Sequence, residues 1–146
     1  MFGVNTMRQL FLYHFIGCNG FAAVYSQIVG ILSTKLPAQD AEAVEFALNE
    51  AVSNALRYGP RGAGEAAVTV KMRFFPNRLV LRIKDQGQGF PAVEKMQEVQ
   101  KKMLGDIFAE MITSSQGRGI IIMLSVVDRV LYNSSGNEVM LIKRIA

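Results

Sequence analysis

The sequence predicts an α+β fold, a two-layer sandwich in which helices pack on a mixed, mostly antiparallel sheet. Apolar residues recur at three- and four-residue steps over 21–58, which is typical of amphipathic helices. They alternate over 66–75 and 78–85, which is typical of strands. With 146 residues, of which 50% are hydrophobic and 19% charged, the chain can bury one core, and we expect a single domain over 1–146.

The N-terminal half contributes one strand and two helices to this prediction. Residues 8–16 are rich in Phe, Leu, Tyr and Ile and predict a strand that breaks at Asn19-Gly20. The apolar period then predicts a helix from Phe21 to about Leu36. Asp40 has the side chain of an N-cap for a second helix that runs to about Tyr58.

The C-terminal half predicts two hairpins separated by helices. Alternation over 66–75 and 78–85 predicts the first hairpin, and the second spans about 128–145. Between them, residues 91–116 are polar, rich in methionine and weakly helical, whereas 117–127 predict a buried helix. Helices grouped on hairpins in this way favour the α+β class.

Composition narrows the classes of function. The net charge of +4 is modest and the basic residues are scattered, with Arg57 and Arg61 closest to a patch, so we expect no nucleic acid partner. No segment reaches the roughly 20 apolar residues that a transmembrane helix needs, so we expect no membrane partner. The single Cys18 excludes an internal disulfide and a thiolate zinc site.

One N-terminal feature would favour export from the cytoplasm. Phe15-Ile-Gly-Cys18 loosely resembles a lipoprotein processing site. However, the apolar run before it is short, is interrupted by His14 and is followed by a predicted helix rather than a polar linker. We therefore expect a cytoplasmic protein, and we expect His14, the only histidine, to be structural.

Glu50 and Asn54 form the first candidate site segment. They lie four residues apart in the second predicted helix, so both side chains project from one face. An Asn oxygen suits Mg²⁺, which takes its other ligands from water and phosphates, and a carboxylate one turn away can accept a proton. The alternative is a solvated polar stripe, although Asn is a poor helix former for a position among alanines.

Asp85, Gly87 and Gly89 form the second segment, directly after a predicted strand. The glycines let the backbone pass close beneath a flat ligand. Because an ionised carboxylate only accepts hydrogen bonds, Asp85 can accept one from the exocyclic amino group of adenine, where guanine has a carbonyl. The alternative is a glycine-rich turn with an exposed acid.

Gly117, Arg118 and Gly119 form the third segment and open the apolar helix predicted over 117–127. Free N–H groups and the positive end of a helix make an anion site there, where Arg118 can contact phosphate or lie in solvent. The alternative is that the glycines serve helix packing. In this order, and with Arg57 flanking them, the three segments indicate a nucleotide site.

The three segments resemble the motifs of the GHKL (Bergerat-fold) ATPases, and most closely those of the small bacterial anti-sigma factor serine/threonine kinases. The resemblance covers nearly the whole chain. In that branch the helix motif is E-A-x-x-N-A, followed by an acid-glycine motif and a pair of phosphate-side glycines. The matching positions are Glu50, Ala51, Asn54 and Ala55, then Asp85, Gly87 and Gly89, then Gly117 and Gly119.

The resemblance implies the chemistry of these residues. Asn54 would bind Mg²⁺, Asp85 would recognise the adenine of ATP, and Glu50 would assist phosphoryl transfer to a Ser or Thr of a partner. Residues 91–116 would form the ATP lid. The partners would be a sigma factor or similar regulator and an antagonist protein with a phosphorylatable Ser or Thr. A homodimer is compatible with these expectations.

Two positions depart from this branch. Tyr58 stands where the branch has His, and the stretch before it resembles histidine kinases. Those enzymes commonly carry Asn at the position of Glu50 and need a helical hairpin bearing a phosphorylatable His, for which we expect no room in 146 residues. In the last hairpin, Gly136-Asn-Glu-Val replaces a common Gly-Thr and puts one adenine contact in doubt.

Three hypotheses of function follow. The first is an ATP-dependent serine/threonine kinase that sequesters a regulator in a partner-switching pathway. The second is a nucleotide-gated binding module with little or no transfer activity, which the Tyr58 substitution leaves open. The third is a histidine-kinase-type catalytic domain that acts on a separate phosphotransfer protein. Glu50 favours the first over the third.

Overall fold

The computed structural model describes residues 9–58, 66–87, 91–105 and 115–145. Five strands form one sheet in the order β1-β2-β3-β5-β4, and every neighbouring pair is antiparallel. The strands are β1 Gln9–Ile16, β2 Ala67–Phe75, β3 Arg78–Asp85, β4 Arg129–Tyr132 and β5 Glu138–Arg144. Both predicted hairpins and the N-terminal strand are confirmed.

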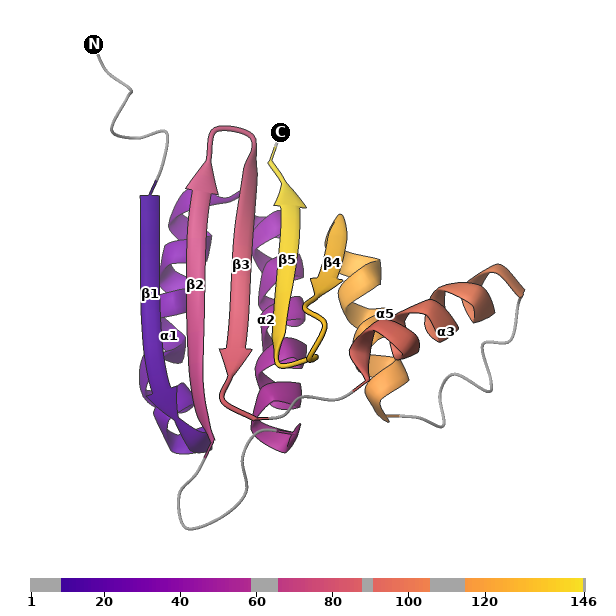
Figure 1. Cartoon of the computed structure of the whole chain (residues 1–146). Helices are drawn as coiled ribbons and strands as arrows, with labels where there is room; N and C mark the ends of the chain where they lie inside the picture. The colour runs from indigo at the N-terminus through magenta and orange to yellow at the C-terminus, as the bar shows by residue number, and fades with distance from the viewer. Residues whose placement is uncertain (1–8, 59–65, 88–90, 106–114, 146) are drawn as a thin grey trace.

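Two helices cover one face of this sheet, and two more lie at and beyond its β4 edge (Figure 1). They are α1 Gly17–Lys35, α2 Ala38–Tyr58, α3 Ala92–Gly105 and α5 Ser115–Val126. The first two run behind the strands, α5 packs beside α2, and α3 packs on α5 (Figure 1). The α+β sandwich is therefore confirmed. No helix in the described part of the chain combines the length and apolar character needed to cross a bilayer.

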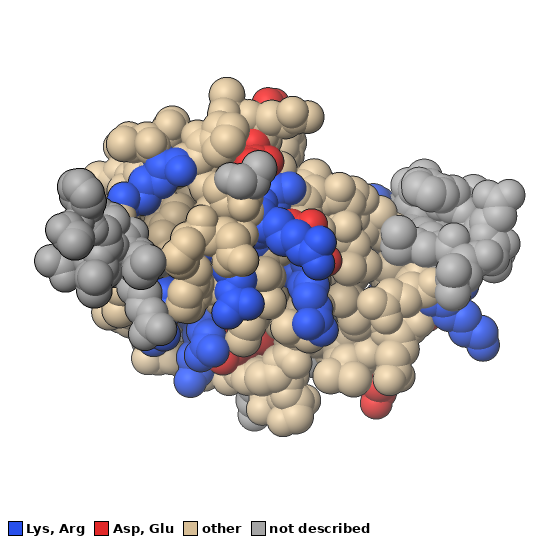
Figure 2. Space-filling view, turned by 90° about the horizontal axis from the view of Figure 1, so that it is seen from above, with Lys and Arg blue, Asp and Glu red and all other residues tan. Residues whose placement is uncertain are grey.

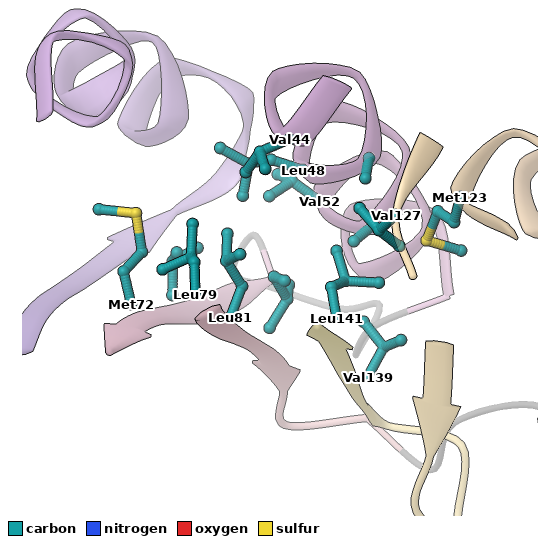
Figure 3. Close-up of a cluster of buried hydrophobic side chains, with 14 of the residues drawn as sticks. Val44, Leu48, Val52, Met72, Leu79, Leu81, Met123, Val127, Val139 and Leu141 are labelled. Atoms are coloured by element: carbon teal, nitrogen blue, oxygen red, sulfur yellow. The ribbon is translucent and has the colours of Figure 1, made fainter. Parts of the chain in front are cut away.

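The core lies between the helices and the inward face of the sheet. Successive side chains of a strand point to opposite faces, so β2 and β3 each bury every second residue. Figure 3 shows side chains of α2, among them Val44 and Leu48, facing Leu79 and Leu81 of β3, and all four are fully buried. Leaving such side chains in water would cost roughly 1.5–3 kcal/mol each, which holds α2 firmly on the sheet.

Two predicted element boundaries are wrong. The strand β1 passes directly into α1 at Gly17, whose φ of 67° lies in the left-handed region. Its N–H donates to the Ala66 carbonyl at 2.9 Å, so the chain turns there and the helix runs through Asn19-Gly20. α2 begins at Ala38, which places Asp40 in the first helical turn rather than at the N-cap.

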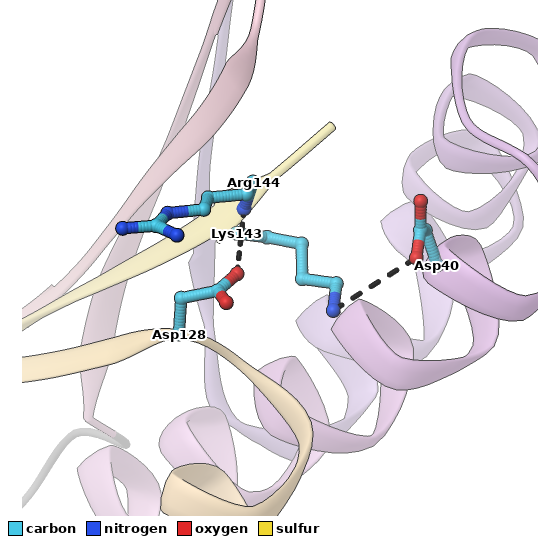
Figure 4. Close-up of polar contacts among 4 residues, drawn as sticks. All are labelled: Asp40, Asp128, Lys143 and Arg144. Carbon is cyan, nitrogen blue, oxygen red and sulfur yellow. Dashed lines mark hydrogen bonds and ion pairs between the residues drawn. The ribbon is translucent and has the colours of Figure 1, made fainter. Parts of the chain in front are cut away.

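The C-terminal end of β5 is anchored on both sides (Figure 4). Lys143 Nζ lies 3.8 Å from Asp40 Oδ1 of α2, and the Arg144 N–H donates to Asp128 Oδ2 at 2.7 Å. These contacts fix one end of β5 against α2 and the start of β4. The opposite end of β5 leads into the cluster of polar residues described next.

Candidate functional site

Glu50 and Asn54 lie one turn apart on α2, and Asn54 lines one cavity with Asp85, the last residue of β3. Asn54 is only 5% exposed, whereas Glu50 is half-buried. The Asn54 Nδ2 atom is buried and makes no hydrogen bond of standard geometry. Because leaving a buried polar atom unsatisfied costs about 1–3 kcal/mol, the Asn54 amide is suited to a ligand more than to the stability of the fold.

Gly119 of α5 packs directly against this pair. A Cβ atom at Gly119 would lie 3.0 Å from Glu50 Oε2 and 3.3 Å from Asn54 Nδ2. Only a residue without a side chain therefore leaves both groups where they are. The sequence predicted a helix opening at Gly117, but α5 begins at Ser115. The free N–H groups of its first turn belong to 115–118, and Gly119 lies in the second turn.

Asp85 is the last residue of β3 and is 5% exposed. Burial raises the pKa of its carboxyl above the usual range, and the Gly87 N–H, which donates to Oδ1 at 2.6 Å, partly opposes that rise. The Asp85 N–H itself donates to the Asn137 carbonyl at 3.0 Å. The turn after β3 thus holds an acid at the inner edge of the sheet, with a backbone donor fixing its orientation.

Asn137 connects this turn to the β4–β5 turn. Its Nδ2 donates to the Gly87 carbonyl at 3.2 Å, and its Oδ1 accepts from Asn133 Nδ2 at 2.6 Å. Asn133 Oδ1 in turn accepts the N–H groups of Gly136, Asn137 and Glu138. The position at which the sequence departs from the Gly-Thr pattern is therefore occupied by a side chain that braces the acid-glycine turn.

Tyr132 completes the cluster, although it was not among the site residues predicted from the sequence. Burial raises the pKa of its phenol far above the usual value; the Asn54 amide lowers it and the Glu50 charge raises it. The phenol therefore stays neutral at physiological pH beside both residues of α2. The available signal was the period of β4, because Val130 and Tyr132 are two apart and share the inward face.

A narrow cavity of about 20 Å³ lies between these groups. It is lined by Ala51, Asn54, Ala55, Ile83, Asp85, Tyr132, Gly136, Asn137, Glu138 and Val139. The volume holds about one water molecule and is much smaller than a nucleotide base. The cavity brings the first and second predicted segments together, and Gly119 joins the third to them through Glu50.

The remaining predicted site residues lie around this centre. Arg57 is exposed in the last turn of α2, and Arg118 is exposed in the first turn of α5. Gly117 belongs to the same turn of α5. Gly89 lies outside the described residues, as do Arg61 and the segment 106–114 of the predicted lid. The described part of that lid is mostly helix α3.

Comparison with known proteins agrees with this arrangement. The family model of the histidine kinase-like ATPase domain matches residues 22–143, which include every predicted site residue. The chain belongs to this family. Within the ATPase family, the anti-sigma kinase resemblance is supported by serine-protein kinases RsbW of Listeria innocua serovar 6a and Listeria monocytogenes serotype 4a. Each is 28% identical over 105 residues, or 71% of this chain and 66% of the relative, just under two thirds.

The side chains around the cavity are of the chemical types that bind a magnesium nucleotide. An Asn side chain such as that of Asn54 carries a hard amide oxygen, and the Asp85 carboxyl is a hydrogen-bond acceptor that the Gly87 N–H holds in one orientation. The Gly119 backbone leaves the space beside Glu50 and Asn54 that a side chain would fill. The cavity itself is smaller than a base.

Proposed function

We propose that this chain is an ATP-dependent serine/threonine kinase of the anti-sigma-factor type, acting in the cytoplasm as one domain with an ATP lid over 91–116. It would hold a sigma factor or similar regulator and phosphorylate an antagonist protein. The observation that carries the proposal is the packing of Gly119 against Glu50 and Asn54. That contact joins the acid-amide pair of α2 to the helix whose first turn is suited to phosphate.

The binding roles follow from the geometry. Asp85 would accept a hydrogen bond from the adenine amino group, with the Gly87 and Gly89 backbone beneath the base. Asn54 would hold Mg²⁺ against the phosphates. The N–H groups of the first turn of α5, including those of Gly117 and Arg118, would bind phosphate oxygens, and the side chains of Arg57 and Arg118 would add positive charge.

Transfer would depend on Glu50. When bound, Mg·ATP supplies the phosphoryl group, and ADP leaves as the bond to the γ-phosphorus breaks. Glu50 would accept the proton of the partner's Ser or Thr hydroxyl as its oxygen forms the new bond to phosphorus. Glu50 is half-buried beside Gly119 of α5, so its carboxylate lies where α2 and α5 meet.

A nucleotide-gated binding module is the second candidate. The small volume of the cavity, about 20 Å³, favours it, because a site that enlarges for its ligand couples nucleotide binding to a change in shape. In such a module Asp85 and Asn54 would bind nucleotide as above, while transfer would be weak or lost. A histidine-kinase-type domain would differ from both in the amino acid that it phosphorylates.

The test separates binding from transfer. Calorimetry should give tighter binding of Mg·ATP than of Mg·GTP, because Asp85 can only accept at the base. Single-turnover labelling then uses radiolabelled ATP and, as acceptor, a small antagonist-domain protein encoded beside this gene. Asn54→Ala should lose magnesium-dependent binding and transfer. Glu50→Gln should keep binding while transfer falls by about 10²–10⁴-fold.

Each outcome selects one hypothesis. Phosphoserine or phosphothreonine in the acceptor supports the kinase, and phosphohistidine would instead indicate the histidine-kinase type. Tight Mg·ATP binding without transfer would leave the binding module. Equal affinity for ATP and GTP would remove Asp85 from base recognition, and wild-type transfer by Glu50→Gln would remove Glu50 from the chemistry.

A further inference from the structure

The outer face of the sheet is not covered by any described helix and carries a dense group of cations. Because side chains alternate along a strand, the residues opposite the core share this face. Its cations are Lys71, Arg73, Arg78, Arg82, Lys84, Arg129 and Arg144. The described strands place one carboxylate, Glu138, among them. Figure 2 shows Lys and Arg side chains close together at the end that carries the β2–β3 turn.

These cations are concentrated well beyond the composition of the chain. Seven cations and one carboxylate give this face a charge of +6, whereas the whole chain carries +4. The remainder of the protein is therefore net negative. These basic residues are scattered along the sequence but not in three dimensions, because residues of three antiparallel strands and a fourth at the edge meet on one surface.

Several of these cations oppose one another directly. Lys71 is the register partner of Arg82, and Arg78 is the register partner of Arg144. Like charges at directly opposite positions of an antiparallel pair destabilise a sheet. Lys84, by contrast, lies opposite Glu138. These two repulsive pairs do not stabilise the sheet. An anionic ligand would neutralise them, so the face is suited to bind one.

The surface between the cations is apolar. An open hollow of about 260 Å³ contains the half-buried Val80, Met140 and Ile142, with Lys71, Arg73 and Arg82 on its rim. On the neighbouring strand β1, Leu10, Leu12 and Ile16 are each more than half exposed. The surface therefore offers charge and apolar area together, as protein interfaces do.

We propose that this outer face binds a protein partner through a segment in which acidic and apolar side chains alternate. Charge complementarity selects an acidic occupant, and the hollow between the cations takes its apolar side chains. A second copy of this chain is disfavoured, because two faces of charge +6 would repel. The proposal does not depend on the nucleotide site, which lies on the helix side of the sheet.

A nucleic acid fits this face less well than a protein. Sheets that bind single strands stack bases on exposed aromatic rings. The described aromatic rings of this face are those of Phe75 and His14. The Arg78 guanidinium lies over the Phe75 ring at 4.9 Å from its centroid, and His14 Nδ1 hydrogen-bonds with Thr69 Oγ1 at 3.0 Å. A membrane could reach the exposed Leu10, Leu12 and Ile16 of β1, but it could not reach the half-buried Val80, Met140 and Ile142 between the cations, which a peptide segment can.

The test uses fluorescence anisotropy with the full chain and a short labelled peptide of alternating Glu and Leu. We expect saturable binding that weakens as salt rises, and much weaker binding of the matched peptide of alternating Glu and Ser. The double variant Lys71→Gln/Arg82→Gln should weaken peptide binding by about tenfold, the scale of two exposed ion pairs. Its melting temperature should rise, because a repulsive cross-strand pair is removed.

Lys95→Gln/Lys101→Gln is the matched control, because it removes the same charge from α3, away from the sheet. This control should bind the peptide as the wild type does, and Lys71→Gln/Arg82→Gln should bind Mg·ATP as the wild type does. Equal loss in the two double variants, or no saturable peptide binding, would overturn the proposal. Tighter binding of a single-stranded oligonucleotide, or of phosphatidylcholine vesicles containing phosphatidylserine, would replace the protein partner with that ligand.

Discussion

The two faces of the sheet differ in where their polar groups lie: they are buried on one face and exposed on the other. On the helix side, Asn54 and Asp85 are each 5% exposed and lie among side chains of the core. On the outer face, seven cations lie in or near solvent and repel one another across the strands. Both arrangements cost stability, one through lost hydration and the other through repulsion between like charges.

The difference shows what each face is suited to do. Buried groups with fixed neighbours can discriminate between similar ligands, because a misplaced partner leaves them unsatisfied. Exposed charges attract an oppositely charged surface over about one Debye length but discriminate less. Small changes of shape should therefore damage the helix side far more than the outer face. Three variants measure how sensitive the helix side is.

Gly119→Ala should have the largest effect. The new Cβ would meet Glu50 Oε2 at 3.0 Å and Asn54 Nδ2 at 3.3 Å, so both side chains must move by a few tenths of an ångström or more. Displacement of positioned groups can lower transfer by about 10²-fold. Stability should change little, because alanine favours a helix by about 0.5–1 kcal/mol and the crowding opposes that gain.

Gly30→Ala is the matched control for this variant. Gly30 also lies within a helix, but a Cβ there would meet nothing within 4 Å. It should raise the free energy of unfolding by about 0.5–1 kcal/mol and leave transfer unchanged. Single-turnover rates and urea denaturation of both variants separate an effect on transfer from an effect on stability. Full transfer activity in Gly119→Ala would show that the close approach has no functional consequence.

Asp85→Asn should have the next largest effect, a loss of ATP affinity of about 1–3 kcal/mol, since the base loses a charged acceptor. The same variant should be more stable than the wild type at pH 7. Burial raises the pKa of Asp85 in the folded state, so folding favours its protonated form. The stabilisation from that proton is complete below the unfolded pKa and is lost as pH rises through the folded pKa.

Urea denaturation at several pH values checks the sign of this effect. Asn carries no charge to desolvate, so the variant escapes the penalty that the ionised Asp85 carries near neutrality. The two free energies of unfolding should converge as the pH falls through the raised pKa of Asp85 toward about 4. A wild type that is more stable than the variant at pH 7 would contradict the burial argument.

Asn137→Ala should have the smallest effect. It removes the hydrogen bond to the Gly87 carbonyl and the one from Asn133, and we expect ATP affinity and stability each to fall by about 0.5–1.5 kcal/mol. Asn137→Thr keeps a hydroxyl donor and should recover part of the affinity. Calorimetry of both variants, with the exposed turn residue Asn77 changed to Ala as control, tests the bracing role.

Local patterns predicted most of the fold. The alternation of β2 and β3 and the apolar period of α2 are properties of neighbouring residues, so they are visible in the sequence. The start of α1 was not predictable in this way. It depends on the positive φ of Gly17 and on a hydrogen bond to Ala66, which is distant in the chain.

The candidate site was predicted in its motifs but not in its assembly. Glu50, Asn54 and Asp85 were identified from local spacing and glycine pattern, and the structure places them around one end of the sheet. Tyr132 and the bracing role of Asn137 were missed, because a partner fifty positions away, such as Gly87, has no local signature. The cationic face was missed for the same reason, since only strand register brings Lys71 opposite Arg82.

The bridge between Asp85 and Asn137 also bears on the order in which the chain folds. The β2–β3 hairpin joins near neighbours such as Phe75 and Arg78, so it can form early, whereas β5 joins the sheet from far along the chain. Asp85 is the last residue of that hairpin. Its backbone N–H would stay hydrated until the β4–β5 turn docks and Asn137 accepts its hydrogen bond. Asp85, the proposed base acceptor, therefore gains its contact with Asn137 only when the β4–β5 turn docks, and a chain with β5 undocked would have the hairpin but not the cavity beside Asp85.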